Sequence, residues 1–378
     1  MSTLFTSISE LRTVSERGTL NDAAIIAQSG TIAWVGPASE APAADEKVDL
    51  GGRAVLPGWV DSHTHMVFDG DRSAEFEARI SGGSYEAGGI AVTMDATRQA
   101  GTDRLDQLVA DRVAAGRRGG TTTFETKTGY GLNTESEVEA AKVASRHVDD
   151  VTFLGAHLVP PGADAEEYLD EVVGPMLEGV APYVQWIDVF CERGAFNEEQ
   201  SRRVLEAGKK LGLGLRVHGN QLGEGPGVAL AVELGAASVD HVNHLTDEDV
   251  ELLANSDTVA TMLPACDLST REPLAPGRTL LDAGATLAIA SNLNPGTSYT
   301  SSMNYCVTTA VLQQHLSVDE AIHAATTGGA TALRRHNVGN GLDPQGRPAK
   351  GTIVEGAAAD LHVLDAPSAV HLAYRPGM

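Results

Sequence analysis

The sequence predicts an α/β protein: a (β/α)₈ TIM barrel with a small β-sandwich domain formed from both chain termini. Apolar, strand-like runs alternate along the middle of the chain with segments that carry apolar residues at helical spacing. Eight such runs occur, and eight parallel strand–helix units favour a closed barrel. Both chain ends consist mainly of short strand-like runs and turn residues. An open doubly wound sheet is the alternative, but no GxGxxG follows an early strand.

The small β domain is expected over residues 1–55 and 350–378. The segment TLNDAAIIAQSGTIAWVGPA predicts a hairpin, because apolar stretches flank the turn residues Gly30, Gly36 and Pro37. Near the other end, GTIVEGAAADLHVL (351–364) predicts two short strands around a turn. The two β-rich ends are therefore expected to share one small domain.

The barrel is expected over residues 56–349. Its eight predicted strands are AVLPGWVDSHTH (54–65), TTTFET (121–126), VTFLGAH (151–157), WIDVFCE (186–192), GLRVHG (214–219), SVDHV (238–242), VATMLP (259–264) and TLAIASN (286–292). Helices are predicted between them, for example over 135–148 and 197–212. The Gly- and Pro-rich stretch 336–350 predicts a surface loop.

Composition narrows the classes of function. The 378 residues include 27 basic and 51 acidic side chains, giving a net charge of −24, which disfavours binding to nucleic acids or anionic membranes. No apolar run is long enough to cross a bilayer, and the N-terminus lacks the features of a signal peptide. Cys191, Cys266 and Cys306 are too few and too widely spaced for a disulfide framework. A cytoplasmic protein with three buried thiols is expected.

Polar residues that end the apolar runs mark the predicted site, because barrel enzymes carry catalytic groups at the carboxyl ends of their strands. These residues are His63, His65, His157, His218, His241 and Asn292. His63 and His65 lie two residues apart, so both imidazoles can face one metal ion. A single histidine at a strand end is more often structural, but histidines at four of eight strand ends favour a metal site.

Several motifs resemble the imidazolonepropionases of the amidohydrolase superfamily. VLPGWVDSHTH is similar to the opening of that superfamily as a whole. The more specific segments, in order, are HMVFDGDR, TTFETKTGYGL, TFLGAHLVPP, VHGNQLG, VDHVNHL, NPGTSYTSSM and LDAPSAVHLAYRPG. Together they span most of the chain between Gly51 and Met303, and the last lies near the C-terminus.

The resemblance implies a hydrolase that opens the ring of 4-imidazolone-5-propanoate to give N-formimino-L-glutamate in histidine breakdown. It implies one zinc or iron ion, held by His63, His65, His218 and the residue at position 292. It places His241 next to the reacting carbonyl or water. It also implies a substrate with a carboxylate tail, a homodimer, and a further strand beyond YRPG, where the chain ends at Met378. The substrate-binding residues that it implies are Arg72, Tyr130, His157, Asn294 and Gly296.

Asn292 departs from the family, which carries a metal-binding, proton-accepting aspartate at this position. An amide oxygen can ligate weakly, but it cannot act as a general base. The nearest preceding carboxylate in the sequence is Asp282. Gln221 lies where some relatives have glutamate, so a second acid–base group is either absent or supplied elsewhere in the chain. Strongly reduced turnover is therefore expected. A substitution made to trap a ligand and a natural change both account for Asn292.

Three functions are consistent with these residues. The first is imidazolonepropionase activity, impaired by Asn292. The second is hydrolysis of another carboxylated cyclic amide, such as a hydantoin-like ring, since Arg72 and the NPG turn suit any ring with an acidic tail. The third is binding without catalysis, which Asn292 favours and the retained histidines oppose.

Overall fold

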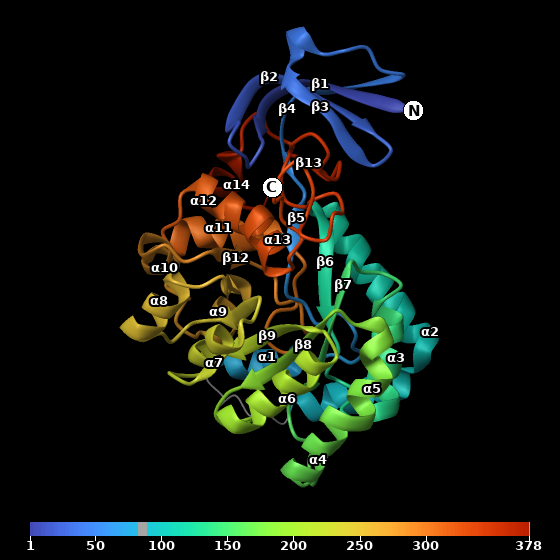
Figure 1. The fold of residues 1–378 in the computed structure, drawn as a ribbon, viewed down its shortest axis with the longest axis vertical. Coiled ribbons are helices and arrows are strands. Elements are labelled where there is room, and N and C mark those ends of the chain that lie inside the picture. The colour runs from blue at the N-terminus through green and yellow to red at the C-terminus, as the bar shows by residue number, and fades with distance from the viewer. Residues whose placement is uncertain (82–88, 378) are drawn as a thin grey trace.

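The computed structural model describes residues 1–81 and 89–377. Its larger sheet contains eight parallel strands in sequential order from β5 to β12 (Figure 1). The strands are β5 (Trp59–Asp61), β6 (Thr121–Lys127), β7 (Asp150–Ala156), β8 (Trp186–Cys191), β9 (Gly214–Gly219), β10 (Ser238–His241), β11 (Val259–Met262) and β12 (Leu287–Ile289). This arrangement confirms the predicted barrel.

The barrel closes through residues just beyond the first and last strands. Thr64 and Leu293 form a parallel bridge, and the His65 amide donates to the Leu293 carbonyl over 2.8 Å. The Asn292 amide donates to the His63 carbonyl over 3.0 Å. Closure therefore joins the His63–His65 segment directly to the segment that carries Asn292.

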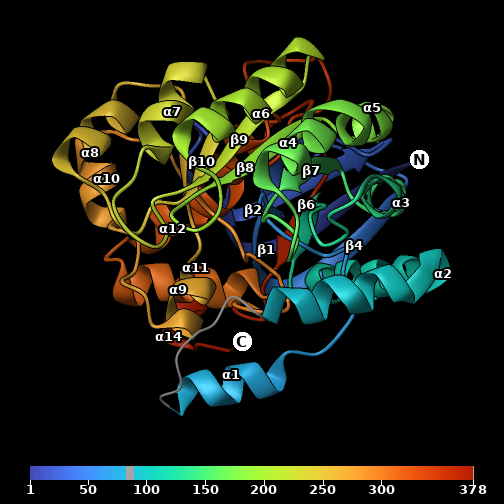
Figure 2. The ribbon, with the colours of Figure 1, turned by 90° about the horizontal axis from the view of Figure 1, so that it is seen from below.

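Helices surround the barrel strands, and Figure 2 shows α1 at the periphery. The helices are α1 (Ser73–Ile80), α2 (Gly89–Arg118), α3 (Thr134–Ala144), α4 (Ala165–Glu171), α5 (Leu177–Val180), α6 (Glu198–Lys210), α7 (Gly227–Leu234), α8 (Asp247–Ala254), α9 (Pro264–Thr270), α10 (Gly277–Ala283), α11 (Met303–Gln313), α12 (Val318–His323), α13 (Gly329–Ala332) and α14 (His371–Tyr374). Short 3₁₀ or π turns are η1 (Ala38–Glu40), η2 (Val172–Met176), η3 (Ala181–Tyr183) and η4 (Ala324–Gly328). Within the described ranges, no helix is long and apolar enough to span a membrane.

The smaller sheet has five strands from both chain ends, in the order β13-β4-β1-β2-β3. They are β1 (Ser2–Arg12), β2 (Thr19–Gln28), β3 (Thr31–Pro37), β4 (Glu46–Pro57) and β13 (Leu361–Val363). The predicted hairpin is confirmed: β2 and β3 pair antiparallel across Ser29 and Gly30, which have φ values of 52° and 79°. Two consecutive left-handed residues are typical of the tight turns that match strand twist.

Two predicted strands differ from the structure. In the segment 351–364 only β13 forms, because Gly351 and Gly356 adopt left-handed φ values of 71° and 88° that interrupt an extended run. Ile353 still packs in the core of the small sheet. The run 54–65 is divided between two sheets: β4 ends at Pro57 in the small sheet, and β5 begins at Trp59 in the barrel.

The division at Gly58 fixes where the small sheet lies relative to the barrel. A side chain at Gly58 would place its Cβ 2.1 Å from Thr122 Oγ1, so the crossing between sheets requires glycine. Because β4 leads directly into the start of β5, the small sheet lies at the amino end of that barrel strand (Figure 1). The carboxyl end of β5 therefore points away from the small sheet.

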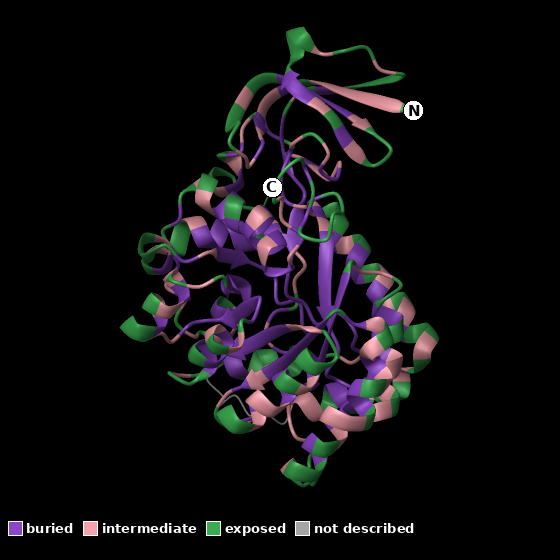
Figure 3. Ribbon diagram, viewed as in Figure 1, coloured by how far each residue is buried: buried purple, intermediate pink, exposed green. Residues whose placement is uncertain are grey.

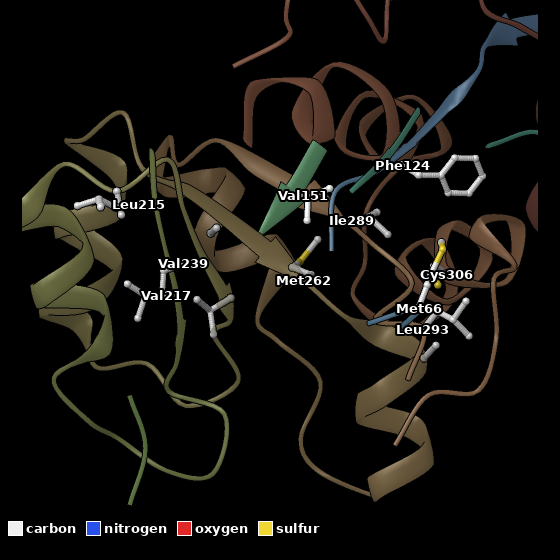
Figure 4. Packing of buried hydrophobic residues seen from close by; sticks show 14 of the residues in the cluster. Met66, Phe124, Val151, Leu215, Val217, Val239, Met262, Ile289, Leu293 and Cys306 are labelled. Carbon is white, nitrogen blue, oxygen red and sulfur yellow. The ribbon is translucent and has the colours of Figure 1, made fainter. Parts of the chain in front are cut away.

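The main core lies between the barrel strands and the helices around them. Figure 3 shows buried strands inside a shell of helices with exposed outer faces. Figure 4 shows members of this cluster contributed by several strands and by α11. Cys191, Cys266 and Cys306 are all buried thiols, as predicted. The segment 336–350 contains neither a helix nor a strand and forms the predicted loop.

Candidate metal centre and substrate pocket

Three histidines converge at the carboxyl ends of the barrel strands. His63 and His65 follow β5, and His218 lies in β9. One ring nitrogen from each lies within 4.8 Å of the others, and the Nε2 atoms of His65 and His218 are 3.5 Å apart. All three rings are buried. The structure therefore brings together the three predicted metal-binding histidines.

Two buried carboxylates orient two of these rings. His63 Nδ1 donates to Asp240 Oδ2 over 2.7 Å, and His218 Nδ1 lies 3.0 Å from Asp188 Oδ2. Burial alone would raise the pKa of Asp240, but Arg216 and His63 outweigh it and hold this pKa well below the usual range. A proton on each Nδ1 leaves the Nε2 lone pairs for a metal.

The buried polar atoms of the centre fit a cation. Within the described ranges, His63 Nε2 and Asn292 Oδ1 are buried without a hydrogen-bond partner. Burial lowers the pKa of His63 well below its usual value, as does Lys127, so the ring is neutral. Neutral imidazoles and an amide oxygen are acceptable donors for zinc or iron.

Asn292 lies just after β12 and has a left-handed φ of 51°. Its side chain is hydrogen-bonded to that of Cys266, and burial raises the pKa of this thiol to about 12. The amide is 2% exposed and lines the pocket. The structure thus places Asn292 beside the histidine cluster, as the sequence predicts.

His241 ends β10 on the same side of the barrel. Its ring centroid lies 5.5 Å from that of His218 and 5.8 Å from that of His63. Burial lowers its pKa well below the usual value, and His218 and His63 lower it further, so the imidazole is neutral. Its φ of 88° is rare for a side-chain-bearing residue and is typical of functional sites.

The structure places two carboxylates near Asn292 that are farther away in the sequence than Asp282. Asp61 accepts hydrogen bonds from Ser291 N and Oγ at 2.9 and 2.6 Å. Asp267, in α9, has an oxygen within 4.8 Å of a ring nitrogen of His241 and of Cys266 Sγ. Asp267 is 1% exposed. In the sequence it resembles an ordinary acidic residue in the first turn of a helix, so spacing alone gave no signal.

Asp267 is expected to make the stability of the fold depend on pH. Burial raises its pKa to about 7 from 3.8, so the folded state binds a proton more tightly than the unfolded chain. Stability should therefore fall as the pH rises from about 4 to about 7. Asp267→Asn should reduce the difference in Tm between pH 5 and pH 8, measured by calorimetry. The exposed control Asp257→Asn should leave that difference unchanged; equal effects of both substitutions would contradict the prediction.

A cavity of about 260 Å³ opens beside the histidines. Its lining includes His65, Arg72, Arg79, Tyr130, His157, Arg193, His218, Gln221, His241, Asn292, Asn294 and Gly296. All of the predicted substrate-binding residues therefore line one cavity. Arg79 and Arg193 were not predicted. Arginine is common on protein surfaces, and neither lies in a motif that distinguishes it.

Tyr130 and His157 form one wall of this cavity. Tyr130 lies between Gly129 and Gly131, as predicted for a tight turn, and three amides of this turn donate to the Glu137 carboxylate over 2.7–2.9 Å. His157 Nδ1 donates to the Gly129 carbonyl over 2.8 Å. Its ring stacks on His65, with centroids 5.7 Å apart. Burial lowers the pKa of His157 to about 4, so this ring is also neutral.

Arg72 and the NPG turn form the opposite wall. Arg72 is 8% exposed and makes a two-pronged ion pair with Glu75, at 2.9 and 2.7 Å. Arg72 therefore both lines the pocket and makes an ion pair with Glu75. A Cβ on Gly296 would lie 2.5 Å from Arg72 Nη1, so glycine permits this approach. The Asn294 side chain binds its own turn, accepting from the Gly296 and Thr297 amides at 2.9 and 2.8 Å.

Gln221 lines the cavity from the loop after β9. Its backbone amide, like that of Leu222, donates to Glu192, whose pKa is raised by burial. The side-chain amide of Gln221 is neutral and cannot supply the acid–base group that a glutamate would.

A closed parallel barrel with a buried histidine cluster at its strand ends is the arrangement expected of the amidohydrolase class that the motifs indicate. The fold is similar to that of 5-methylcytosine deaminase from Klebsiella pneumoniae, with a TM-score of 0.75, 16% identity, and coverage of 99% of this chain and 94% of that one. It is also similar to a zinc-bound adenosine deaminase from Xanthomonas campestris, with a TM-score of 0.70, 20% identity, and coverage of 98% and 88%. At these identities the likeness concerns the fold.

The chain belongs to the imidazolonepropionase family. The imidazolonepropionase of Arthrobacter sp. (strain FB24) is 64% identical over 389 residues, covering 100% of this chain and 96% of that protein. That of Saccharopolyspora erythraea is 63% identical over 378 residues, covering 100% and 95%. No protein-family model matches the chain. These relatives confirm the resemblance that the motifs indicated.

Proposed function

We propose that the protein hydrolyses the ring of 4-imidazolone-5-propanoate to N-formimino-L-glutamate, a step of histidine degradation. The observation that carries the proposal is the convergence of His63, His65 and His218 beside a cavity that arginines and neutral rings line. Membership of the imidazolonepropionase family supports the same substrate.

We infer that His63, His65, His218 and the Asn292 carbonyl oxygen hold one divalent metal ion, zinc or iron. When bound, the metal lowers the pKa of a coordinated water to around 7 and polarises the ring carbonyl. The donor set suits both metals, and zinc is bound in the structurally similar adenosine deaminase.

The side chains around this metal are suited to binding and orienting the substrate, but they are poorly suited to proton transfer. His241 is neutral and lies close enough to the cluster to hydrogen-bond a developing oxyanion. Asn292 can ligate through its oxygen, but it cannot take the proton from an attacking water. Gln221 is likewise neutral. This protein is therefore expected to turn over its substrate slowly.

The two walls of the cavity suit the two ends of the substrate. Tyr130 and His157 present an aromatic surface and a ring nitrogen to a small planar ring. At the opposite wall, the Arg72 guanidinium and the turn at Gly296 are placed to bind a carboxylate tail. The bound tail would share the Arg72 guanidinium with Glu75.

Arg72→Ala is expected to raise KM for 4-imidazolone-5-propanoate by about 10- to 100-fold, the effect of losing a charged hydrogen bond of about 1.5–3 kcal/mol. The change should act on KM more than on kcat, because the tail lies away from the reacting carbonyl. Arg72→Lys is the matched control, since it retains the charge but loses the forked geometry, and it should give an intermediate KM. A fall in kcat alone, with KM unchanged, would place Arg72 elsewhere in the mechanism.

Steady-state hydrolysis with metal quantified in the same sample tests the proposed function. The expected result is slow conversion of 4-imidazolone-5-propanoate by protein that holds one metal ion. A hydantoin ring with the same propionate tail is the comparison substrate, and faster hydrolysis of that ring would transfer the assignment to another cyclic amide. We also infer that the protein is cytoplasmic and forms a homodimer. The molar mass measured by light scattering on the native protein tests the homodimer.

A further inference from the structure

A buried lysine lies behind the histidine cluster, at the end of β6. The side chain of Lys127 is 0% exposed. Its Nζ lies 3.1 Å from Glu125 Oε1, 2.9 Å from Asp188 Oδ2 and 3.8 Å from Asp240 Oδ2. One ammonium group therefore contacts three buried carboxylates. None of these four residues belongs to the proposed metal ligands.

Each of the three carboxylates contacts a different part of the histidine cluster. Asp240 accepts from His63 Nδ1 at 2.7 Å, and Asp188 lies 3.0 Å from His218 Nδ1. Glu125 Oε2 accepts from the Thr64 amide at 3.1 Å, and Thr64 is the residue between His63 and His65. The carboxylates thus contact the rings of His63 and His218 and the backbone between His63 and His65.

The backbone of Lys127 adds to the same restraint. Its amide donates to the Thr64 carbonyl over 2.8 Å, and Thr64 Oγ1 donates to the Glu125 carbonyl over 2.6 Å. The His63–His65 segment is therefore fixed to β6 by both main chain and side chains.

Charge makes the ammonium group of Lys127 necessary at this position. Among the described residues, Arg216 is the other buried cation of the cluster, and its ion pair is with Asp240 at 3.1 Å. Without Lys127, Asp188 would keep only His218 as an ion-pair partner, and Glu125 would have no cation within ion-pair distance in the described ranges. A buried carboxylate without a cation is strongly unfavourable and rearranges.

We propose that Lys127 is a positioning residue for the metal centre: through Asp240 and Asp188 one ammonium group orients the rings of His63 and His218, and through Glu125 it fixes the backbone between His63 and His65. The inference rests on the metal centre of the proposed function, but not on the identity of the substrate. Partners of metal-ligating histidines typically change metal affinity by about 10- to 100-fold when they are removed.

The test is the zinc affinity of Lys127→Met, measured by competition with a chelator on the full chain. We expect affinity to fall by about 10- to 100-fold, and the visible spectrum of the cobalt-loaded protein to change because the ligand geometry is altered. Lys210→Met removes an exposed lysine from α6 and should bind zinc as the unsubstituted protein does. Unchanged zinc affinity and an unchanged cobalt spectrum in Lys127→Met would overturn the proposal.

A second variant separates positioning from simple charge balance. Lys127→Met combined with Glu125→Gln removes one buried charge of each sign, while a glutamine oxygen can still accept from Thr64. We expect the thermal stability of this double variant to recover toward that of the unsubstituted protein while zinc affinity stays low. Recovery of both would show that Lys127 only offsets charge. If Lys127→Met alone does not fold, the double variant supplies the measurement. Failure of the unsubstituted chain to bind zinc or iron would instead contradict the proposed metal centre.

Discussion

Asn292→Asp is expected to raise kcat for hydrolysis of 4-imidazolone-5-propanoate by about 10²- to 10⁴-fold, the contribution of a positioned general base. The substitution preserves shape and places an ionisable carboxylate where Asn292 Oδ1 already lies buried without a partner in the described ranges. The neighbouring Cys266 is protonated, since burial raises its pKa to about 12, and it can donate to the second carboxylate oxygen. An aspartate at position 292 is therefore compatible both with the proposed metal site and with the Cys266 thiol.

Metal content must be quantified alongside kcat, because a carboxylate also ligates more strongly than an amide. Asn294→Asp is the matched control: it adds the same charge two residues away, on a side chain that binds its own turn, and should not raise kcat. If Asn292→Asp holds metal but gives no increase with this ring or with the hydantoin, Asn292 is not the disabling residue. Binding without catalysis would then be the better description of this protein.

His218→Ala is expected to abolish measurable turnover of the Asn292→Asp form and to lower metal affinity by more than about 100-fold. The decrease in metal affinity on losing a direct ligand should be larger than the roughly 10- to 100-fold decrease on losing a residue that hydrogen-bonds to a ligand. His218 Nε2 lies 3.5 Å from that of His65, so its removal takes one imidazole from the centre of the cluster. Metal content after dialysis and kcat at saturating substrate are the measurements.

The exposed His315 supplies the comparison for that experiment, and His315→Ala should retain both metal and turnover. Chelation of the metal followed by reconstitution with zinc or with iron should restore turnover to the Asn292→Asp form. The metal that gives the higher kcat at equal occupancy would identify the functional ion. Turnover by fully metal-depleted protein would contradict a metal-dependent mechanism.

The barrel was predictable because parallel strands buried on both faces appear as continuous apolar runs, and all eight runs lie in the structure in sequence order. The division of the first run was not predictable. Both sides of Gly58 are apolar, and only the packing of Gly58 against Thr122 shows that the chain changes sheets there. Likewise, the left-handed glycines at 351 and 356 prevent a strand that apolar composition alone favours.

The clustered histidines were predictable from their positions at strand ends, whereas the charged residues that contact them were not identified. Asp188 and Asp240 lie inside the buried strands β8 and β10, and a charged residue in such a run is itself a signal of a partner. Lys127 and its three carboxylate partners come from three different strands, β6, β8 and β10, so only the folded barrel brings these charges together. Asp267 gave no signal at all, because its helix follows a strand in the ordinary way.

The backbone at position 292 limits how this site can change over evolutionary time. Its φ of 51° is tolerated by few residues other than glycine, asparagine and aspartate. Asparagine and aspartate are neighbours in the genetic code and nearly identical in shape, so sequences with either residue at position 292 are one mutation apart, and the fold can exchange them without repacking. A lineage that carries Asn292 can therefore acquire the proposed catalytic aspartate in a single mutational step, as long as the buried charges behind the histidines remain intact.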